Sequence, residues 1–488
     1  MTSRTLRAAT ATTVAVALLA LPSLAPASST MLTGIADENV LKGATPGGAE
    51  ATVAKWKAEG VQDVRMFAQW NKLAPSTDAT KAPNGFAGSD PKSYDFSTLD
   101  RNVDLVRKHG MSVTLVISGP GPVWASQEAV RRNGTWKPNP TLFGEFATAV
   151  TKHIAAKIDR YIVWNEPNVA TWLQPQYSCT GTTCKPYSPH LYRQLAQAGY
   201  DAIHANDPSA RIAVGATSSR GDKVAIRTNA TFQPMNFLRE MSCVTSKYKA
   251  KRSGLCKNFK PVTGYALAYH PHSGQISPGR RESNTGDAKL GDLSRLSSVV
   301  DRLTRARRLK VVGAKKMPFW FDEYAYQSSP PDKIEGVSLR RQSLWSQWGW
   351  SIAARSSRVQ MLTQYEWFDE PTGSDGLYNR WQSGLYFADG RAKPLAAAFA
   401  NPIYGWRTSK AGYVWGQARP GSQAIQVTLQ RRSGSGSGYR DYKVITTNGV
   451  GQFKVKVPKS TKAQYRFTFV DPLSKQTRTS DAVGLAKD

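Results

Sequence analysis

Short apolar segments with the character of β-strands alternate along this chain with longer amphipathic segments of helical periodicity. Strand-like segments occur at eight places, which are residues 32–35, 61–67, 111–118, 160–165, 211–216, 262–270, 317–324 and 359–367. Helix-like segments lie between them, at residues 51–59, 97–109, 140–156, 189–206, 293–309 and 338–354. Parallel strands need helical crossovers of about this length, so the eight strand-like segments predict an α/β fold of the (β/α)8 TIM-barrel type. An open, doubly wound sheet would produce a similar alternation.

The pattern changes after Pro402, where short strand-like runs are separated by turn-forming pairs such as Pro-Gly, Asn-Gly and Asp-Pro. The runs are residues 414–415, 424–430, 441–446, 452–457, 464–470 and 474–478, and a Ser-Gly repeat at 433–438 is typical of a hairpin loop. We therefore predict a barrel domain over residues 28–403 and a small all-β sandwich over residues 404–488. The sandwich has a net charge of +11, which suits docking on anionic material. Packing against the barrel is the alternative role.

The first 27 residues have the pattern of a cleaved secretory signal peptide. Arg4 and Arg7 precede an uncharged stretch over residues 8–24, and the Ala-Pro-Ala sequence at 25–27 matches the small-residue pattern that signal peptidases cleave. No later segment approaches the roughly 18 apolar residues that a membrane span needs. The sequence therefore predicts a secreted, extracellular protein without a transmembrane span.

Four cysteines fit an oxidising compartment. Cys179 and Cys184 bracket four residues, and Cys243 and Cys256 bracket twelve, so two local disulfides are the simplest pairing. A zinc site is the weaker alternative, because the chain lacks a second closely spaced pair. No zinc-protease, nucleophile-elbow or phosphate-loop motif is present, so the sequence implies neither a metal nor a cofactor.

The formal net charge is +30, or +28 without the signal peptide. Such a charge favours an acidic partner, for which an anionic polysaccharide, a cell-wall polymer and nucleic acid are candidates. In residues 292–310, however, apolar side chains recur at helical spacing, and Arg295, Arg302, Arg305 and Arg308 take other positions, which is typical of a solvated outer helix face. Basic residues are also spread over the rest of the chain. We therefore expect a generally cationic surface and no nucleic-acid partner.

Two glutamates end strand-like segments on opposite sides of the predicted barrel. Glu166 follows Asn165 in "YIVWNEPNVATW", at the end of the fourth segment, and Glu323 lies in "MPFWFDEYAY", at the end of the seventh. In a TIM barrel, the C-terminal ends of the strands line the active site. Glycoside hydrolysis needs two carboxyl groups there, about 5–5.5 Å apart if one attacks the sugar and about 6.5–9.5 Å apart if a water molecule lies between them. Strand alternation is expected to turn the neighbouring Asp322 the other way.

These segments resemble the catalytic motifs of clan A retaining glycoside hydrolases. "VWNEPN" is similar to the acid/base motif of the fourth strand, and "FWFDEYAY" is similar to the nucleophile segment of the seventh. With "GLYFADGRAKPLAAAF" after the eighth strand, the resemblance extends over roughly residues 32–403, and families thirty-nine and five, which include cellulase-like and xylosidase-like enzymes, are the most similar. The resemblance implies that Glu166 is the general acid/base, that Glu323 is the nucleophile, and that Asn165 binds the sugar 2-hydroxyl.

The resemblance also implies roles for two basic residues. Arg65, in "DVRMFAQW" at the end of the second strand, would hold Glu323 ionised through its fixed charge. His270, in "AYHPHSG", would lie near the nucleophile. Two residues later, where family members often carry tyrosine, this chain has His272, so which histidine contacts Glu323 stays open.

Aromatic residues are candidates for sugar binding. Trp367, in "QYEWFDEP" after the eighth strand, would form the platform under the sugar next to the cleaved bond. Trp70 and Trp124 are further candidates, and packing in the core is the alternative for all three. The substitutes for the nucleophile, should Glu323 not serve, are Asp322, Glu366, Asp369 and Glu370.

The sequence thus predicts a secreted glycosidase that cleaves O-glycosyl bonds of a poly- or oligosaccharide by double displacement, with water as its co-substrate. One alternative is a non-catalytic, cell-surface glycan-binding protein on the same scaffold. Another is a transglycosylase that uses the same residues. The loops carry no readable code for the sugar or the linkage. We further expect the ring closed by Cys179 and Cys184 to form a wall of the substrate cleft, because it follows the acid/base strand closely.

Overall fold

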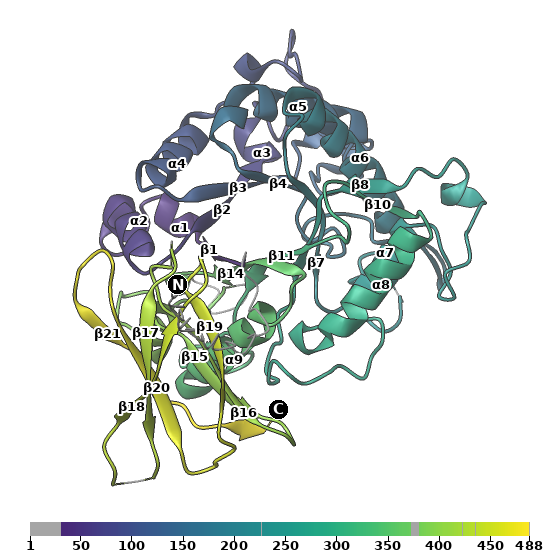
Figure 1. Cartoon of the computed structure of the whole chain (residues 1–488). Helices are drawn as coiled ribbons and strands as arrows, with labels where there is room; N and C mark the ends of the chain where they lie inside the picture. The colour runs from purple at the N-terminus through teal and green to yellow at the C-terminus, as the bar shows by residue number, and fades with distance from the viewer. Residues whose placement is uncertain (1–30, 226, 372–379, 422, 435, 488) are drawn as a thin grey trace, which may run out of the picture.

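A computed structural model describes residues 31–225, 227–371, 380–421, 423–434 and 436–487. Figure 1 shows a ring-shaped α/β domain with a smaller all-β domain beside it. The predicted signal peptide lies outside the described residues. Within the described part of the chain, no helix is both long and apolar enough to cross a membrane.

Eight parallel strands close into a barrel, as the alternation predicts. They are β1 (Leu32–Ala36), β2 (Asp63–Gln69), β3 (Ser112–Ser118), β4 (Arg160–Val163), β7 (Ile212–Ser218), β9 (Ala266–His270), β11 (Phe319–Tyr324) and β14 (Val359–Tyr365). Their order around the barrel is β1, β14, β11, β9, β7, β4, β3 and β2. The last strand pairs in parallel with the first, Leu32 opposite Met361, so the sheet has no free edge. The TIM-barrel prediction is confirmed, and the open-sheet alternative is wrong.

Helices surround the barrel in Figure 1. The helices are α1 (Glu38–Leu41), α2 (Gly48–Ala58), α3 (Trp70–Leu73), α4 (Ser97–Lys108), α5 (Pro140–Ile154), α6 (Ser188–Asn206), α7 (Pro234–Met241), α8 (Leu293–Arg305), α9 (Leu339–Ala354) and α10 (Pro394–Ala400). Local signals fix their ends: the side chain of Asn139 accepts the N–H groups of Thr141 and Leu142, and Pro140 occupies the first position of α5. All six predicted helices are present. Four helices have no counterpart in the sequence prediction, α1, α3, α7 and α10, because each has only four to eight residues and too short an apolar pattern.

Two boundaries differ from the sequence prediction. The predicted strand over residues 262–270 is divided into β8 (Val262–Gly264) and β9. The predicted helix over residues 293–309 ends earlier, and β10 (Leu309–Val311) pairs in parallel with β8 outside the barrel. The helix stops because Arg307 has a left-handed backbone conformation, with φ of 56°, which is the conformation that commonly ends helices.

The C-terminal domain is a β-sandwich of two four-stranded sheets, as predicted. The first sheet has the order β19 (Gln452–Val457), β16 (Gly412–Gln417), β15 (Ile403–Arg407) and β22 (Ala486–Lys487). The second has the order β18 (Arg440–Thr446), β17 (Gln426–Arg432), β20 (Gln464–Val470) and β21 (Thr477–Thr479). Apolar side chains such as Val414, Phe453 and Phe467 form the core between the sheets.

The sandwich packs against the N-terminal ends of barrel strands. The side-chain amide of Gln62, just before β2, donates a hydrogen bond to the carbonyl of Gly421 at 2.9 Å. That of Gln417 donates to the hydroxyl of Thr33, near the start of β1, at 3.3 Å. The C-terminal ends of the barrel strands, where a TIM barrel has its active site, lie at the other end. The sandwich therefore packs against the barrel at the end opposite to the C-terminal ends of the strands.

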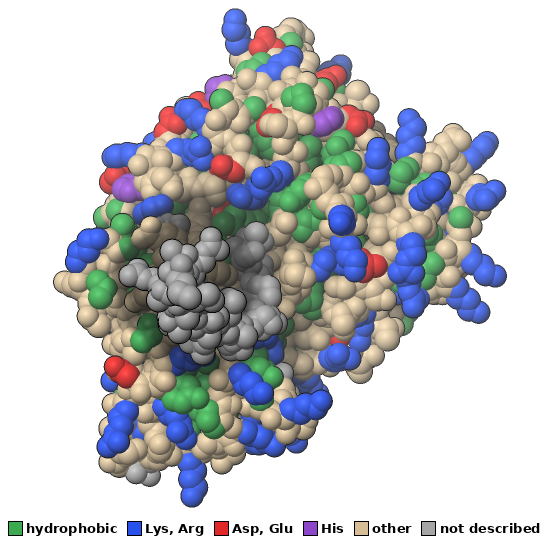
Figure 2. All heavy atoms as spheres, in the orientation of Figure 1, with side chains coloured by type: hydrophobic (Ala, Val, Ile, Leu, Met, Phe, Trp, Pro, Cys, Tyr) green, Lys and Arg blue, Asp and Glu red, His purple; other side chains and the backbone are tan. Residues whose placement is uncertain are grey.

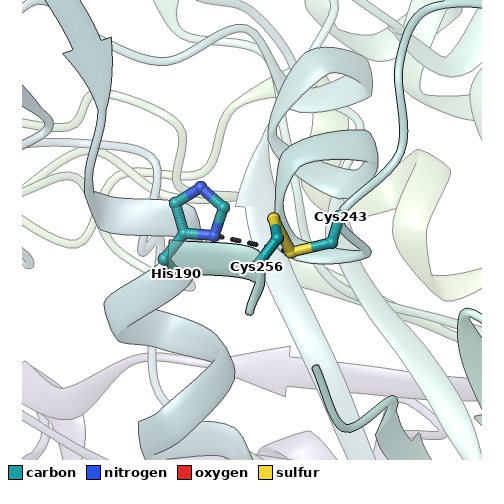
Figure 3. A group of neighbouring side chains, drawn as sticks. All are labelled: His190, Cys243 and Cys256. Atoms are coloured by element: carbon teal, nitrogen blue, oxygen red, sulfur yellow. Dashed lines mark hydrogen bonds between the residues drawn. A yellow bond between two sulfur atoms is a disulfide. The ribbon is translucent and has the colours of Figure 1, made fainter. Parts of the chain in front are cut away.

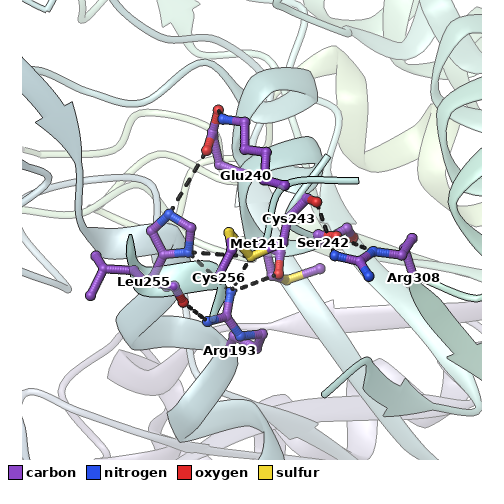
Figure 4. Close-up of a disulfide and its surroundings, with 10 residues drawn as sticks. Arg193, Glu240, Met241, Ser242, Cys243, Leu255, Cys256 and Arg308 are labelled. Carbon is purple, nitrogen blue, oxygen red and sulfur yellow. Dashed lines mark hydrogen bonds and ion pairs between the residues drawn. A yellow bond between two sulfur atoms is a disulfide. The ribbon is translucent and has the colours of Figure 1, made fainter. Parts of the chain in front are cut away.

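Both cysteine pairs are joined, Cys179 to Cys184 (Sγ–Sγ 2.06 Å) and Cys243 to Cys256 (2.00 Å). Figure 3 shows the second bond beside His190. In Figure 4, Arg193 reaches into the same group, with its Nη1 3.2 Å from Cys243 Sγ and 3.0 Å from the Nδ1 of the histidine. Bonded sulfurs offer no thiolate, and a guanidinium there repels a metal ion. Because both pairs of sulfurs are bonded to each other, the two predicted disulfides are confirmed and the zinc alternative is wrong.

Candidate active site

Polar side chains from four barrel strands meet at the C-terminal end of the barrel. They come from β2, the segment just beyond β4, the end of β9 and the end of β11, and they are Arg65, Asn165, Glu166, His270, Asp322 and Glu323. One detail differs from the sequence prediction: Arg65 is not at the end of its strand, because β2 continues to Gln69. Its long side chain reaches the other groups from within the barrel.

The backbone that carries Glu166 has an uncommon conformation. Strand β4 ends at Val163, and both Trp164 and Glu166 then have positive φ angles, 70° and 35°. The N–H of Glu166 donates a hydrogen bond to the carbonyl of Ala216 on the neighbouring strand at 2.9 Å. Such conformations cost about 1–3 kcal/mol each in residues with a side chain and occur mostly at functional sites. With this backbone conformation, the carboxyl group of Glu166 lies beside His270, among the other polar groups.

Glu323 lies among positive groups. Its Oε1 is 3.0 Å from Nη2 of Arg65, and its Oε2 is 3.4 Å from Nδ1 of His270 and 3.7 Å from Nε2 of His272. Burial alone would raise the pKa of Glu323, but the charges of His270 and Arg65 outweigh burial and lower the pKa to about 2. Glu323 is therefore an ionised carboxylate at neutral pH. Both histidines contact it, which answers the question that the sequence left open.

Glu166 approaches the same imidazole. Its Oε1 lies 2.9 Å from Nδ1 of His270, and Oε2 of Glu323 lies 3.4 Å from that nitrogen, so the two carboxylate oxygens cannot be farther apart than the sum, about 6.3 Å. The side chain of Glu166 is 20% exposed and that of Glu323 only 9%. Glu166 is thus the member of the pair with better access to solvent protons.

His270 is fully buried and contacts three carboxylates. Besides the two glutamates, Oδ2 of Asp322 lies 3.2 Å from its Nε2. Burial alone would lower the pKa of His270, but the charges of Glu323 and Asp322 and the hydrogen bonds to Asp322 and Glu166 outweigh it and raise the pKa to about 10. The ring is therefore an imidazolium at neutral pH, with both N–H groups donating to carboxylates.

The ligand atoms of His270, His272 and Glu323 lie within 4.8 Å of one another, and these residue types bind transition metals in other proteins. Two features oppose that use. An imidazolium has no lone pair to give a metal, and Arg65 already occupies one side of the carboxylate. The group is better suited to holding a carboxylate ionised and in place.

Asp322 points into the site together with Glu323, so the prediction from strand alternation is wrong. Its Oδ2 accepts a hydrogen bond from Nε of Arg65 at 3.1 Å. The pairing of β11 with β14 shifts register between Phe321 and Tyr324, and such a bulge breaks the alternation of side chains. Two consecutive carboxylates therefore face the same arginine. Asp322 is fully buried, so it positions Arg65 and His270 and does not reach a substrate.

A cavity of about 360 Å³ adjoins Glu166 and His272. Its lining includes Glu166, Arg220, His272, Glu335 and Trp381. The ring of Trp381 lies 5.1 Å from that of His272 and 5.2 Å from that of Tyr365, between centroids. Trp381 is half-buried, so part of the indole remains open to the cavity. This is the aromatic surface that a sugar ring can contact.

The tryptophans that the sequence predicts for this role do not line the cavity. Trp367 is 1% exposed and packs against Trp56 and Phe399, so the prediction of a sugar platform there is wrong. Trp70 and Trp124 are also buried, edge to face with each other, which matches the core-packing alternative. The missed residue, Trp381, lies in the segment after β14. A tryptophan among polar residues beyond the last barrel strand was the available signal.

The substitutes for the nucleophile, apart from Asp322, are engaged elsewhere. Glu366 is 3% exposed, and burial raises its pKa well above the ordinary value. Burial also raises the pKa of Asp369, to about 6, although Lys393 contacts it. Glu370 accepts the N–H of Trp381 at 2.8 Å. Glu370 therefore helps to hold the aromatic surface and is not placed as a nucleophile.

The disulfide-closed ring after β4 is a hairpin of β5 (Tyr177–Thr180) and β6 (Thr183–Pro186), with the two cysteines directly opposite each other. Among the described residues that line the cavity, none comes from this hairpin, so the prediction that it forms a wall of the cleft is wrong. The N–H of Tyr177 donates to the carbonyl of Thr228 at 2.9 Å, in the segment that brings Thr231 to the cavity. The hairpin therefore supports a segment that lines the cavity, and we expect an indirect effect on substrate binding.

Replacing Cys179 and Cys184 with serine is expected to raise KM several-fold, because the supported segment loosens. The loss in stability is expected to be small: so short a ring constrains the unfolded chain by about 2 kcal/mol, or a melting shift of about 2 °C in a chain of this size. Calorimetry and steady-state kinetics measure both. Replacing Cys243 and Cys256, which are buried and close a longer loop, is the control and should lower Tm more. A much lower Tm with unchanged KM in the first variant would show that the hairpin only supports the fold.

No protein-family model matches the chain, and no curated protein matches its sequence. Solved structures of similar shape include a glucosidase from Croceicoccus marinus, which is 12% identical, with a TM-score of 0.48 over 89% of this chain and 94% of that one. A GH5_18 protein from Streptomyces cattleya in complex with GlcNAc is 14% identical, with a TM-score of 0.46 over 76% of this chain and 79% of that one. The β-glucuronidase of Parabacteroides merdae is 11% identical, with a TM-score of 0.41 over 94% of this chain and 50% of that one. These likenesses are too distant to say anything about the reaction at this site.

Proposed function

We propose that this protein is a secreted retaining glycoside hydrolase that acts on a poly- or oligosaccharide. The observation that carries the proposal is the convergence of Glu166 and Glu323 on Nδ1 of His270, which limits the separation of their nearest oxygens to about 6.3 Å. A retaining enzyme needs its two carboxyl groups about 5–5.5 Å apart, whereas an inverting one keeps them about 6.5–9.5 Å apart. This upper limit lies below the range of inverting enzymes, which supports direct attack by a carboxylate.

Glu323 is the nucleophile in this mechanism. Arg65 and His270 keep it ionised, so it attacks the anomeric carbon while Glu166 gives a proton to the leaving oxygen. The glycosidic bond breaks, and an ester forms between Glu323 and the sugar. Glu166, now ionised, takes a proton from a water molecule that attacks the same carbon. The ester bond breaks, the sugar leaves with its original anomeric configuration, and Glu166 is protonated again.

The surrounding residues position the substrate. The side-chain oxygen of Asn165 accepts a hydrogen bond from Nη2 of Arg65 at 2.6 Å, which leaves its amide nitrogen as the donor that we assign to the sugar 2-hydroxyl. We assign Trp381 as the aromatic surface under a sugar ring, in place of Trp367. Nδ1 of His270 contacts both glutamates, and the charge of the imidazolium stabilises the ionised Glu323.

The proposal is tested by incubating the purified protein with a panel of plant, fungal and bacterial-wall polysaccharides and measuring released reducing sugar. We expect release from at least one glycan by the wild type and none by Glu323→Gln. A protein that binds a glycan equally well before and after Glu166→Ala, and releases no sugar, is the non-catalytic glycan-binding protein. Products longer than the substrate identify a transglycosylase.

A further inference from the structure

A second cavity, away from the two glutamates, is lined largely by cations. Its volume is about 660 Å³, and its walls come from the end of α8, from β10 and from the loop between β10 and β11. Five lining residues are exposed cations, namely Arg305, Arg307, Lys310, Lys315 and Lys316. Among the described lining residues Asp301 is the one acid, and Arg358 binds it at 2.8 Å. The wall therefore has a strong excess of positive charge.

A smaller cavity of about 480 Å³ continues this surface, and the exposed Lys257 and Lys260 line it together with one acid, Asp201. Lys260 directly precedes Pro261, which lines the larger cavity. We call the seven exposed cations of the two cavities the basic strip. Figure 2 shows Lys and Arg side chains gathered over the lobe that carries α7, α8, β8 and β10 in Figure 1, with few Asp or Glu among them.

The cationic groups of the basic strip have no partner within the described part of the chain: no ion pair, side-chain hydrogen bond or ring contact involves them. Neighbouring like charges repel one another and weaken the compact state. The strip therefore does not contribute to the stability of this fold. A polyanion bound along it would remove the repulsion.

Arg307 gives a second, independent indication. Its φ of 56° lies in the left-handed region, where glycine fits without strain and a side chain costs energy. The position just after a helix end is one that glycine or asparagine usually fills. Here it holds an arginine whose side chain lines the cationic cavity. Ending α8 does not require an arginine at this position, because glycine adopts the same conformation without strain.

We propose that the basic strip binds an acidic polysaccharide, a linear chain with regularly spaced carboxylate or sulfate groups. No aromatic residue is among the described residues that line the two cavities, so the strip offers no surface on which bases of a single-stranded nucleic acid could stack. Lys315 and Lys316 precede β11, whereas Glu323 lies near its other end, about 13 Å along the strand from Phe319. A polymer held on the strip therefore leaves the catalytic end of the barrel open.

Titration with polygalacturonate at low ionic strength tests the proposal. The variant K310Q/K315Q/K316Q is expected to bind polygalacturonate about tenfold more weakly, with a smaller dependence on salt. The matched control is K443Q/K456Q/K462Q, which removes the same charge from exposed lysines of the sandwich and should change binding by less than about twofold. Both variants should hydrolyse a neutral oligosaccharide at the wild-type rate, so failure of the catalytic proposal is measured separately.

A single substitution, Arg307→Gly, separates binding from folding. It removes one cation and relieves the strained backbone, so binding should weaken while Tm stays unchanged or rises. Three outcomes would overturn the proposal. They are no binding of polygalacturonate by the wild type, equal weakening in the sandwich control, and tighter binding of a short DNA duplex that is lost with the strip. The last would identify a nucleic-acid surface.

Discussion

Replacing Glu323 with glutamine is expected to lower kcat by about four orders of magnitude while the protein remains folded. Glutamine has the same shape, and its oxygen can still accept a hydrogen bond from Arg65, which lies 3.0 Å from the native carboxylate. An amide, however, does not form the glycosyl ester on which double displacement depends. Steady-state kinetics on the best polysaccharide of the panel, with Tm as a check of folding, measure the effect.

The matched control is Glu335→Gln. Glu335 lines the cavity beside Glu166 and His272 and its side chain is exposed, but it contacts neither Arg65 nor His270 in the described structure. Its removal should leave kcat within about threefold of the wild type, as for most surface substitutions. If Glu323→Gln retained a rate close to that of this control, Glu323 would not be the nucleophile.

Replacing Glu166 with alanine is expected to have an effect that depends on the leaving group. With a polysaccharide, whose leaving oxygen needs a proton, the rate should fall by about a thousandfold, within the range of general acid catalysis. With an aryl glycoside that has a good leaving group, the first step should remain fast and the glycosyl ester should accumulate. Added azide, which needs no general base, should then accelerate turnover and give a glycosyl azide of retained configuration.

The control for this experiment is Glu335→Ala, which should respond to neither the leaving group nor azide. If Glu166→Ala lowered the rate equally on both substrates and azide did not restore it, these results would contradict the acid/base role. They would indicate that Glu166 serves mainly to position Nδ1 of His270.

The barrel could be predicted because its signals are local. Each strand is a short apolar run between amphipathic helices, so all eight strands follow from the chain read in order. What failed depends on partners distant in sequence. The split between β8 and β9 depends on pairing with β10, and the orientation of Asp322 depends on the register shift between β11 and β14.

Both glutamates could be predicted for the same reason, since each lies in a recognisable motif at a strand end. Their surroundings could not. That His270 contacts three carboxylates is a consequence of barrel closure, which brings β4, β9 and β11 to one point. Trp367 follows the eighth strand as expected of a sugar platform, but Trp56 and Phe399 enclose it. Trp381 takes the open position next to His272, which only the folded loop reveals.

Proton NMR of the product that forms first tests the retaining mechanism most directly. With a substrate of known anomeric configuration, the retaining mechanism predicts that the same anomer appears first and that the other anomer grows in later by mutarotation in solution. If the opposite anomer formed first, a water molecule rather than Glu323 would have attacked the anomeric carbon, and the proposed double displacement would be wrong.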